Sequence, residues 1–234
     1  MTTTLVFGAS GSIGQAISTH FQGRGSRVID IGRNPTESQS LDWVTWTEDG
    51  VQFLQELNAK LLGSKADSIV WAQGMNFNDE ISDFDPAKHL QMYEANVLFI
   101  LRSLQTIMGG GLLAKNAKLC IISSIWQNIA RQSKLSYCVT KSALQGLVQS
   151  LTIDLGKQGI LVNAVLPGAL DTPMTRSNLS SSQIQKLESA SPMRSLASLD
   201  DVVGLVYYLS SQSNTGITGQ FISADRGFSY ARIL

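Results

Sequence analysis

The sequence predicts an α/β fold in which a doubly wound parallel sheet of about seven strands carries helices on both faces. Short apolar runs of strand length alternate along the chain with stretches whose apolar residues repeat at helical spacing. The chain also opens with a strand, a glycine-rich loop and a helix, a unit that suits such a sheet. Its 234 residues are enough for one large core, so we expect a single domain over residues 1–234.

The individual elements follow from the apolar pattern and its punctuation. We expect strands near residues 4–8, 27–32, 40–43, 67–71, 117–123, 161–166 and 220–223. Helices are expected between them, near residues 13–22, 49–62, 86–107, 135–157 and 200–210, with starting signals at Asp85, Pro86 and Asp200. Because strands and helices alternate throughout, the strands should be parallel, with helices on both faces.

The loop after the first strand has the composition of a phosphate-binding turn. It reads Gly8-Ala9-Ser10-Gly11-Ser12-Ile13-Gly14 and leads directly into a helix-period stretch. Glycines permit a tight turn and let backbone amides approach a pyrophosphate, which the unpaired N–H groups and dipole of a helix N-terminus attract. The flanking strand and helix supply the context that this motif requires.

A second constellation points to proton transfer. Tyr137 and Lys141 lie four residues apart on an expected helix, so the ammonium should lie near the phenol and lower its pKa. Ser124, thirteen residues before Tyr137, follows the apolar run Lys118 to Ile122 and should emerge at the carboxyl end of a buried strand. Open α/β sheets bind their ligands at that edge.

Together these segments resemble the classical short-chain dehydrogenase/reductase family, nearly end to end. Gly8 to Gly14 resembles its TGxxxGxG loop, with Phe7 in place of threonine and Ser12 in place of the middle glycine. Of the family's NNAG stretch, only the glycine remains in Trp71-Ala72-Gln73-Gly74. Further matches are Asn96, Ser124, Tyr137 with Lys141, Val162 to Gly168, Asp171 to Met174, Ile217 to Gln220 and Asp225 to Phe228.

The resemblance implies a Rossmann-type dinucleotide-binding catalytic domain that moves hydride between nicotinamide and a carbonyl or alcohol carbon. Tyr137 would be the proton donor in reduction and Ser124 the hydroxyl that orients the oxygen. Lys141 would lower the pKa of Tyr137 and hold the nicotinamide ribose, while Asn96 would position a water. The resemblance also implies a substrate lid near residues 173–195. Its cofactor-binding residues would be Gly8, Ser10, Gly11, Ser12, Ile13, Gly14, Arg33, Asp42, Trp43, Ala72, Gln73, Gly74, Asn96, Tyr137, Lys141, Pro167, Gly168, Leu170 and Thr172, the last binding the carboxamide.

The coenzyme preference depends on the end of the second expected strand. In relatives that prefer NAD, an acidic residue at the position of Gly32 accepts hydrogen bonds from the adenosine ribose. Gly32 has no carboxylate, and Arg33 can pair a 2′-phosphate, so the sequence favours NADP(H) over NAD(H). Asp30 leaves the alternative open, because NAD would be preferred if the strand ended two residues earlier. At the end of the third strand, Asp42 should accept from the adenine amino group, with Trp43 beside it.

Bulk composition excludes several other classes. Lys and Arg equal Asp and Glu at 18 each, with no basic stripe for nucleic acid and no long apolar segment for a membrane. Two histidines and two cysteines form no metal-ligand pattern, so we expect no metal. We therefore expect a cytoplasmic protein, a homo-oligomer of two or four copies by family analogy, acting on a small carbonyl or alcohol substrate.

Two readings compete with an NADP(H)-dependent carbonyl or 3-oxoacyl reductase. One is an NAD-dependent alcohol dehydrogenase of the same family. The other is a non-catalytic protein that senses NADP, although such a protein commonly loses the tyrosine or the lysine. An extended epimerase or dehydratase is disfavoured, because only about 65 residues follow Gly168. The sequence does not select a substrate among 3-oxoacyl thioesters, small ketones and cyclic alcohols.

Overall fold

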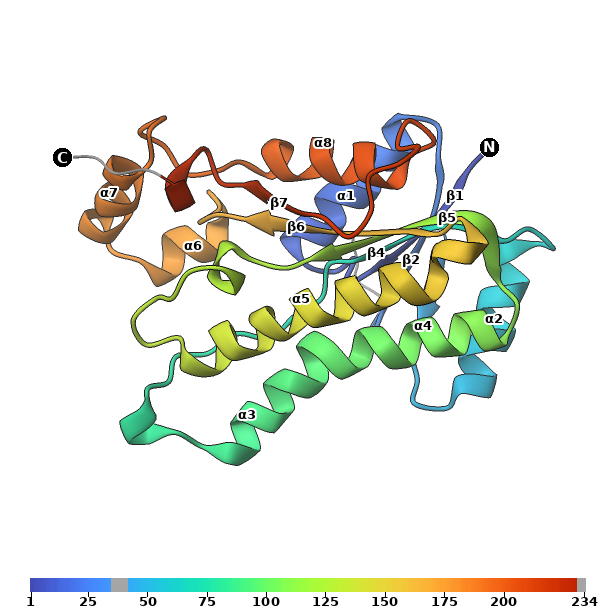
Figure 1. Ribbon diagram of the computed structural model, residues 1–234, viewed down its shortest axis with the longest axis horizontal. Helices are drawn as coiled ribbons and strands as arrows, with labels where there is room; N and C mark the ends of the chain where they lie inside the picture. Colours follow the sequence, from blue (N-terminus) through green and yellow to red (C-terminus); the bar gives the residue numbers. More distant parts are fainter. Residues whose placement is uncertain (35–41, 231–234) are drawn as a thin grey trace.

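The computed structural model describes residues 1–34 and 42–230, and it contains a parallel sheet flanked by helices on both faces (Figure 1). The sheet has seven strands in the order β3-β2-β1-β4-β5-β6-β7 among these residues. Every pairing is parallel. The strands are β1 Thr3–Phe7, β2 Arg27–Gly32, β3 Trp43–Thr45, β4 Ala66–Trp71, β5 Leu113–Ile122, β6 Leu161–Pro167 and β7 Phe221–Ala224. The predicted fold class is confirmed.

The helices occupy the two faces of this sheet. They are α1 Ser12–Gly23, α2 Gly50–Leu61, α3 Pro86–Tyr93, α4 Phe99–Gly109, α5 Leu135–Leu155, α6 Pro173–Asn178, α7 Ser181–Ala190 and α8 Leu199–Ser210. In Figure 1, α1 and α8 lie above the sheet, whereas α4 and α5 lie below it. Short 3₁₀ turns, η1 Ile81–Asp83, η3 Ile125–Gln127, η4 Gly156–Gln158 and η5 Phe228–Tyr230, complete the described chain.

The central strand β1 shows why the sheet is buried on both sides. All five of its residues are buried, and successive side chains point to opposite faces. Leu5 and Phe7 join the larger core under α2, α4 and α5. Val6 joins the smaller core under α1 and α8. Hydrophobic burial on both faces therefore fixes the position of the loop that follows Phe7.

Three elements differ from the sequence prediction. The helix expected over residues 86–107 is interrupted by a π-helical turn, η2 Glu94–Leu98, between α3 and α4. The strand expected near residues 40–43 is β3, which begins only at Trp43; residues 40 and 41 lie outside the described ranges. Segment 173–195, for which the sequence predicted no helix, contains two short helices, α6 and α7. Ser180 starts α7 with a capping box to Gln183, a signal present in the sequence.

Candidate active site

The glycine-rich loop forms a narrow cradle between β1 and α1. Gly8 has φ +75°, and a Cβ added there would lie only 2.5 Å from the backbone nitrogen of Gln73. A Cβ added at Gly14 would lie 2.2 Å from the carbonyl oxygen of Gly8. Glycine is therefore required at both positions. No side chain caps the start of α1, so its first N–H groups face the loop, as an anion site needs.

A cavity of about 930 Å³ opens beside this loop, at the carboxyl ends of β1, β2 and β4. Its walls include seven of the residues predicted to bind cofactor, namely Gly8, Ser10, Gly11, Arg33, Ala72, Gln73 and Gly74. Trp46, Glu48 and Phe99 line it as well, and none of the three was among the residues predicted to bind cofactor. A glycine cradle, an uncapped helix start and a large adjoining cavity fit the pyrophosphate and adenosine half of a dinucleotide.

Seven of the predicted cofactor residues outside this cavity wall lie at the start of α1 and in the segment after β6. Ser12, Ile13 and Gly14 form the first turn of α1. Pro167 ends β6, and Gly168 packs so closely on Asp225 that an added Cβ would lie 2.8 Å from its Cβ. Leu170 is buried beside Ala197, and Thr172 caps α6 by accepting a hydrogen bond from Thr175 N at 3.2 Å.

The four predicted catalytic residues converge at the carboxyl end of β5. Ser124 follows that strand, Tyr137 and Lys141 lie on the first turns of α5, and Asn96 lies in the π-helical turn. The Ser124 hydroxyl lies close enough to Tyr137 to lower the pKa of its phenol, and Ser124 Oγ accepts a hydrogen bond from Trp126 N at 3.3 Å. Lys141 Nζ lies 5.7 Å from the centre of the Tyr137 ring and donates to the carbonyl of Ile122 at 3.0 Å. The structure thus brings these residues together from three separate segments.

Asn96 connects the segment after β4 to helix α5. Its Oδ1 accepts from Met75 N at 2.7 Å, and its Nδ2 donates to Met75 O at 3.1 Å and to Thr140 Oγ1 at 3.0 Å. The π-helical turn re-aims a side chain within a continuous helix, a feature that is frequent at functional sites. A Cβ added at Gly74 would lie 3.1 Å from Asn96 Oδ1 and 3.8 Å from Lys141 Nζ, so these three residues are neighbours.

Burial dominates the protonation of the tyrosine and lysine pair. Burial raises the pKa of Tyr137 to about 12, although the hydrogen bond with Ser124 acts in the opposite direction. Burial also lowers the pKa of Lys141 to about 8. The sequence argument expected the ammonium to lower the tyrosine pKa, and that direction is wrong in this structure. A charged group loses hydration when it is removed from water, whatever the sign of its charge. Burial therefore favours the neutral phenol of Tyr137 and the neutral amine of Lys141.

A buried polar network beside α5 was missed at the sequence level. The carboxylate of Asp79 accepts from Ser136 N at 3.0 Å and from the Ser136 hydroxyl, which also contacts His89 Nδ1 at 2.8 Å. Asp79 therefore caps the start of the catalytic helix from 57 residues away. Lys134 Nζ donates to Asn76 Oδ1 at 2.7 Å and lies 5.9 Å from the Tyr137 ring centre. No local spacing could signal these contacts.

At the end of β2, neither Asp30 nor position 32 offers a carboxylate to the adenosine ribose. Asp30 is buried and accepts a hydrogen bond from Ser18 Oγ at 2.5 Å on the α1 side of the sheet. A Cβ added at Gly32 would lie 2.7 Å from the Trp43 ring, so any side chain at this position would require Trp43 to move. Arg33 is exposed on the cavity wall.

Asp42 is a correction to the sequence prediction. It was expected at the end of the third strand, next to adenine. It instead precedes β3 and forms ion pairs with Arg27 at 3.0 Å and Lys60 at 3.6 Å. Because parallel strands share one carboxyl edge, a residue at the start of β3 lies at the opposite edge from the ligand. Neither Asp42 nor Trp43 is among the residues that line the cavity.

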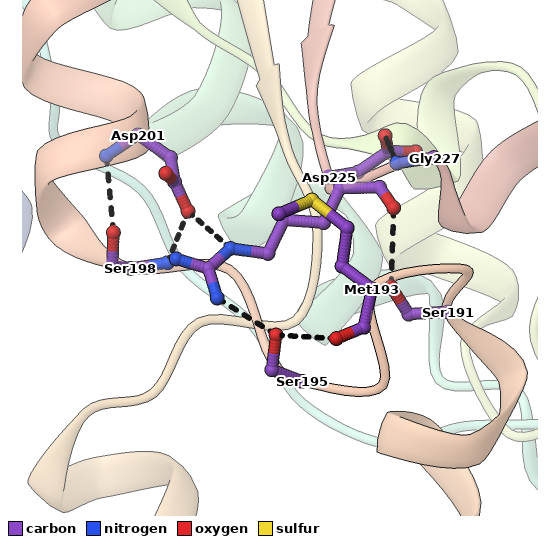
Figure 2. Close-up of polar contacts among 8 residues, drawn as sticks. Ser191, Met193, Ser195, Ser198, Asp201, Asp225 and Gly227 are labelled. Carbon is purple, nitrogen blue, oxygen red and sulfur yellow. Dashed lines mark hydrogen bonds and ion pairs between the residues drawn. The ribbon is translucent and has the colours of Figure 1, made fainter.

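The segment after α7 is fixed by an arginine in the turn after β7 (Figure 2). Arg226 has φ +53°, and its Nε and Nη1 donate to Asp201 Oδ2 and Ser195 Oγ, each at 2.7 Å. Its carbonyl accepts from Ser191 Oγ at 3.1 Å. A second ion pair, between Arg176 and Asp171, lies at the start of α6 and lowers the pKa of Asp171 through the arginine's hydrogen bond. Both ends of segment 173–195 are therefore tied down.

Within residues 1–34 and 42–230, no helix is long and apolar enough to cross a membrane. The same ranges hold no group of three or more His, Cys, Asp or Glu side chains arranged for a metal ion.

Comparison with known proteins identifies the family. A family model described as Enoyl-(Acyl carrier protein) reductase matches residues 8–229. The chain belongs to the short-chain dehydrogenase/reductase family, whose members are oxidoreductases that act on alcohol or carbonyl groups with a nicotinamide coenzyme.

Individual relatives span nearly the whole chain. The uncharacterized oxidoreductase YmfI of Bacillus subtilis is 29% identical over 238 residues, covering 97% of this chain and 98% of the relative. The 3-oxoacyl-(acyl-carrier-protein) reductase FabG of Rickettsia felis is also 29% identical, covering 96% and 95%. A solved gluconate 5-dehydrogenase from Burkholderia cenocepacia, in complex with NADP and tartrate, superposes with a TM-score of 0.89 at 19% identity, covering 99% and 96%. The last of these likenesses shows the fold alone.

Proposed function

We propose that this protein is an NADP(H)-dependent reductase that converts a ketone to a secondary alcohol, with a 3-oxoacyl thioester as the leading substrate class. The observation that carries the reaction type is the grouping of Ser124, whose hydroxyl acts on the Tyr137 phenol, with Lys141, whose Nζ lies 5.7 Å from the centre of the tyrosine ring. Two hydroxyl donors that converge on one point suit an oxygen that gains negative charge. The FabG relative from Rickettsia felis supports the substrate class.

The proposed mechanism uses these groups as donors to a single oxygen. Bound nicotinamide supplies the hydride that reaches the carbonyl carbon. Ser124 Oγ donates a hydrogen bond to the carbonyl oxygen, and Tyr137 gives that oxygen its proton. The carbonyl becomes an alcohol, and Tyr137 is left as a phenolate beside the Lys141 ammonium, which stabilises it. A Lys141 pKa of about 8 lets the lysine return a proton to Tyr137 near neutral pH.

The preference for NADP(H) is supported by the end of β2. With Asp30 engaged by Ser18 and position 32 closed by Trp43, neither carries a carboxylate toward an adenosine ribose. Arg33 reaches the same cavity and offers a guanidinium to a 2′-phosphate. The Burkholderia cenocepacia neighbour, solved with NADP, is consistent with this choice.

An NAD-dependent dehydrogenase of the same family is the second candidate. The observation in its favour is Glu48, a carboxylate on the wall of the same cavity that could accept from ribose hydroxyls. A non-catalytic NADP sensor is the third, and the retained catalytic residues argue against it. By family resemblance we further propose that α6 and α7 form a substrate lid and that the protein acts as a cytoplasmic homo-oligomer.

One pair of measurements tests the proposal. NADPH and NADH are titrated separately by coenzyme fluorescence, and oxidation of each is then followed with a panel of 3-oxoacyl thioesters, small ketones and cyclic ketones. We expect tighter binding of NADPH and turnover with at least one 3-oxoacyl thioester. Equal or tighter binding of NADH would overturn the coenzyme assignment, and binding without any turnover would favour the sensor.

A further inference from the structure

Two aromatic rings line the part of the cavity beside Gly32, where they could stack on a purine. Since the catalytic residues lie beyond Gly74, the nicotinamide half of a coenzyme held at the loop extends that way, and the adenosine half extends toward Gly32 and Arg33. Trp46 and Phe99 line this end, with ring centroids 5.0 Å apart. Their rings provide an apolar, stacking surface suited to a flat base.

Gln73 lies on the wall of this cavity with its amide unsatisfied. Both its Nε2 and its Oε1 are buried, and neither has a hydrogen-bond partner among the described residues. Its backbone packs against Gly8, which fixes the position of the Gln73 Cα. A buried amide without partners is costly to the folded protein, and such groups in native structures call for an explanation.

The other polar residues considered for this role are weaker candidates for binding the base. Asp42, expected for this role, lies at the far edge of the sheet in ion pairs with Arg27 and Lys60. Glu48 is exposed, and a carboxylate only accepts hydrogen bonds. Gln91 and Gln105 line the cavity but are exposed, so their amides already pair with water. Among the described residues that line the cavity, Gln73 alone combines a donor and an acceptor that are shielded from solvent and lack partners.

We propose that the Gln73 side chain recognises the adenine ring of the coenzyme, donating from Nε2 to a ring nitrogen and accepting at Oε1 from the 6-amino group. Glutamine and adenine have complementary donor and acceptor edges and pair in this bidentate way elsewhere. The side-chain torsions of Gln73 swing the amide from the wall into the cavity, where it gains the two partners that it lacks. This inference depends on nicotinamide coenzyme use but not on the preference for NADP(H).

The test combines coenzyme binding with the stability of the free protein. Gln73→Met keeps the length of the side chain and removes both hydrogen-bonding atoms, and Gln73→Leu is a second, branched variant. NADPH is titrated by fluorescence, and melting temperatures are measured without coenzyme. We expect NADPH affinity to fall about tenfold, while the melting temperature of the free protein stays equal or rises, because an unpaired buried amide has been removed. Gln55→Leu, an exposed glutamine on α2, is the matched control and should change neither value.

An analogue separates adenine recognition from general loosening of the site. In reduced nicotinamide hypoxanthine dinucleotide phosphate, the 6-amino donor of adenine is replaced by an oxo group. The unmodified protein should prefer NADPH over this analogue by about tenfold, and both Gln73 variants should bind the two equally. Unchanged NADPH affinity in the variants, or discrimination that survives in them, would overturn the assignment. Either result would leave the proposed reductase activity standing, because NADPH would still bind and turn over.

Discussion

The two halves of the proposed coenzyme site are built in different ways. At the hydride end, Ser124, Tyr137, Lys141 and Asn96 keep the residue types and spacing of the family, and the fold places them close together. At the adenosine end, the residues depart from the family pattern: Gly32 is closed by Trp43, Asp42 faces away, and Gln73 replaces a small residue.

This difference teaches which constraint acts where. Proton and hydride transfer need groups placed within hydrogen-bond reach of one reacting oxygen, so few residue types and few spacings can serve. Binding an adenosine needs only net affinity, which many combinations of stacking and hydrogen bonding supply. Variants at the two ends should therefore differ in kind: changes at the hydride end should lower turnover, and changes at the adenosine end should change coenzyme affinity.

The largest effect should come from Tyr137→Phe at the hydride end. Removing the proton donor should lower kcat by about 10³-fold, within the range for general acid catalysis, while the dissociation constant of NADPH stays nearly the same. Loss of turnover together with unchanged NADPH affinity, measured by fluorescence titration, would support the distinction between the two ends of the site. Tyr208→Phe, an exposed tyrosine on α8, serves as the control. Normal turnover in Tyr137→Phe would remove this residue from the proposed mechanism.

The burial of Lys141 should appear as a pH dependence of stability. Because its pKa is about 8 when folded and higher when unfolded, the unfolded chain binds more protons between these values. The unfolding free energy should therefore gain up to about 3 kcal/mol from this residue as pH rises from 8 to about 10.5. Lys141→Met should lose that gain, and urea unfolding at several pH values measures it.

Exposed Lys115 provides the comparison for that experiment. Lys115→Met should keep the pH dependence of the unmodified protein, because its side chain is in water in both states. If the unfolding free energies of Lys141→Met and the unmodified protein changed in parallel between pH 8 and 10.5, burial would not lower the pKa of Lys141 as inferred here.

At the adenosine end, Arg33→Ala should act on affinity alone. Loss of the guanidinium should weaken NADPH about tenfold, in line with hydrogen bonds to charged groups, and should leave NADH and kcat nearly unchanged. Arg24→Ala, at the end of α1, removes an equal charge from a site outside the cavity. It should leave the affinities for NADPH and NADH unchanged. Equal weakening of NADPH and NADH would contradict a 2′-phosphate contact at Arg33.

The smallest effect should come from Arg226→Gly, at the base of segment 173–195. Glycine relieves the strained φ of +53° but removes the contacts with Asp201 and Ser195. Since exposed ion pairs contribute about 1 kcal/mol or less, we expect KM for the ketone to rise about threefold, with kcat and NADPH affinity unchanged. Arg194→Gly relieves the same φ of 53° and leaves the Arg226 contacts in place. An equal KM change in both variants would mean that backbone strain, not the contacts, sets the effect.

The sequence predicted most of the architecture because its signals are local. Alternating apolar runs gave the order of strands and helices, and Asp85 caps the helix start that was expected there. The start expected at Asp200 lies at Leu199, with Ser198 as its cap. The π-helical turn at Asn96 was not predicted, because it interrupts a hydrophobic pattern that continues on both sides. Strand β3 was placed too early because a three-residue strand has almost no periodicity to detect.

The candidate site divides in the same way. The spacing of the glycine, serine, tyrosine and lysine residues in the motifs was by itself enough to predict the family. Only the tertiary structure decided that Asp30 bonds Ser18, that Trp43 closes position 32, and that Asp79 caps α5 from a distant loop. It also reversed the expected pKa shift of Tyr137. Spacing along a chain reports neighbours on one helix or turn, whereas hydration and contacts between distant segments exist only once the chain is packed.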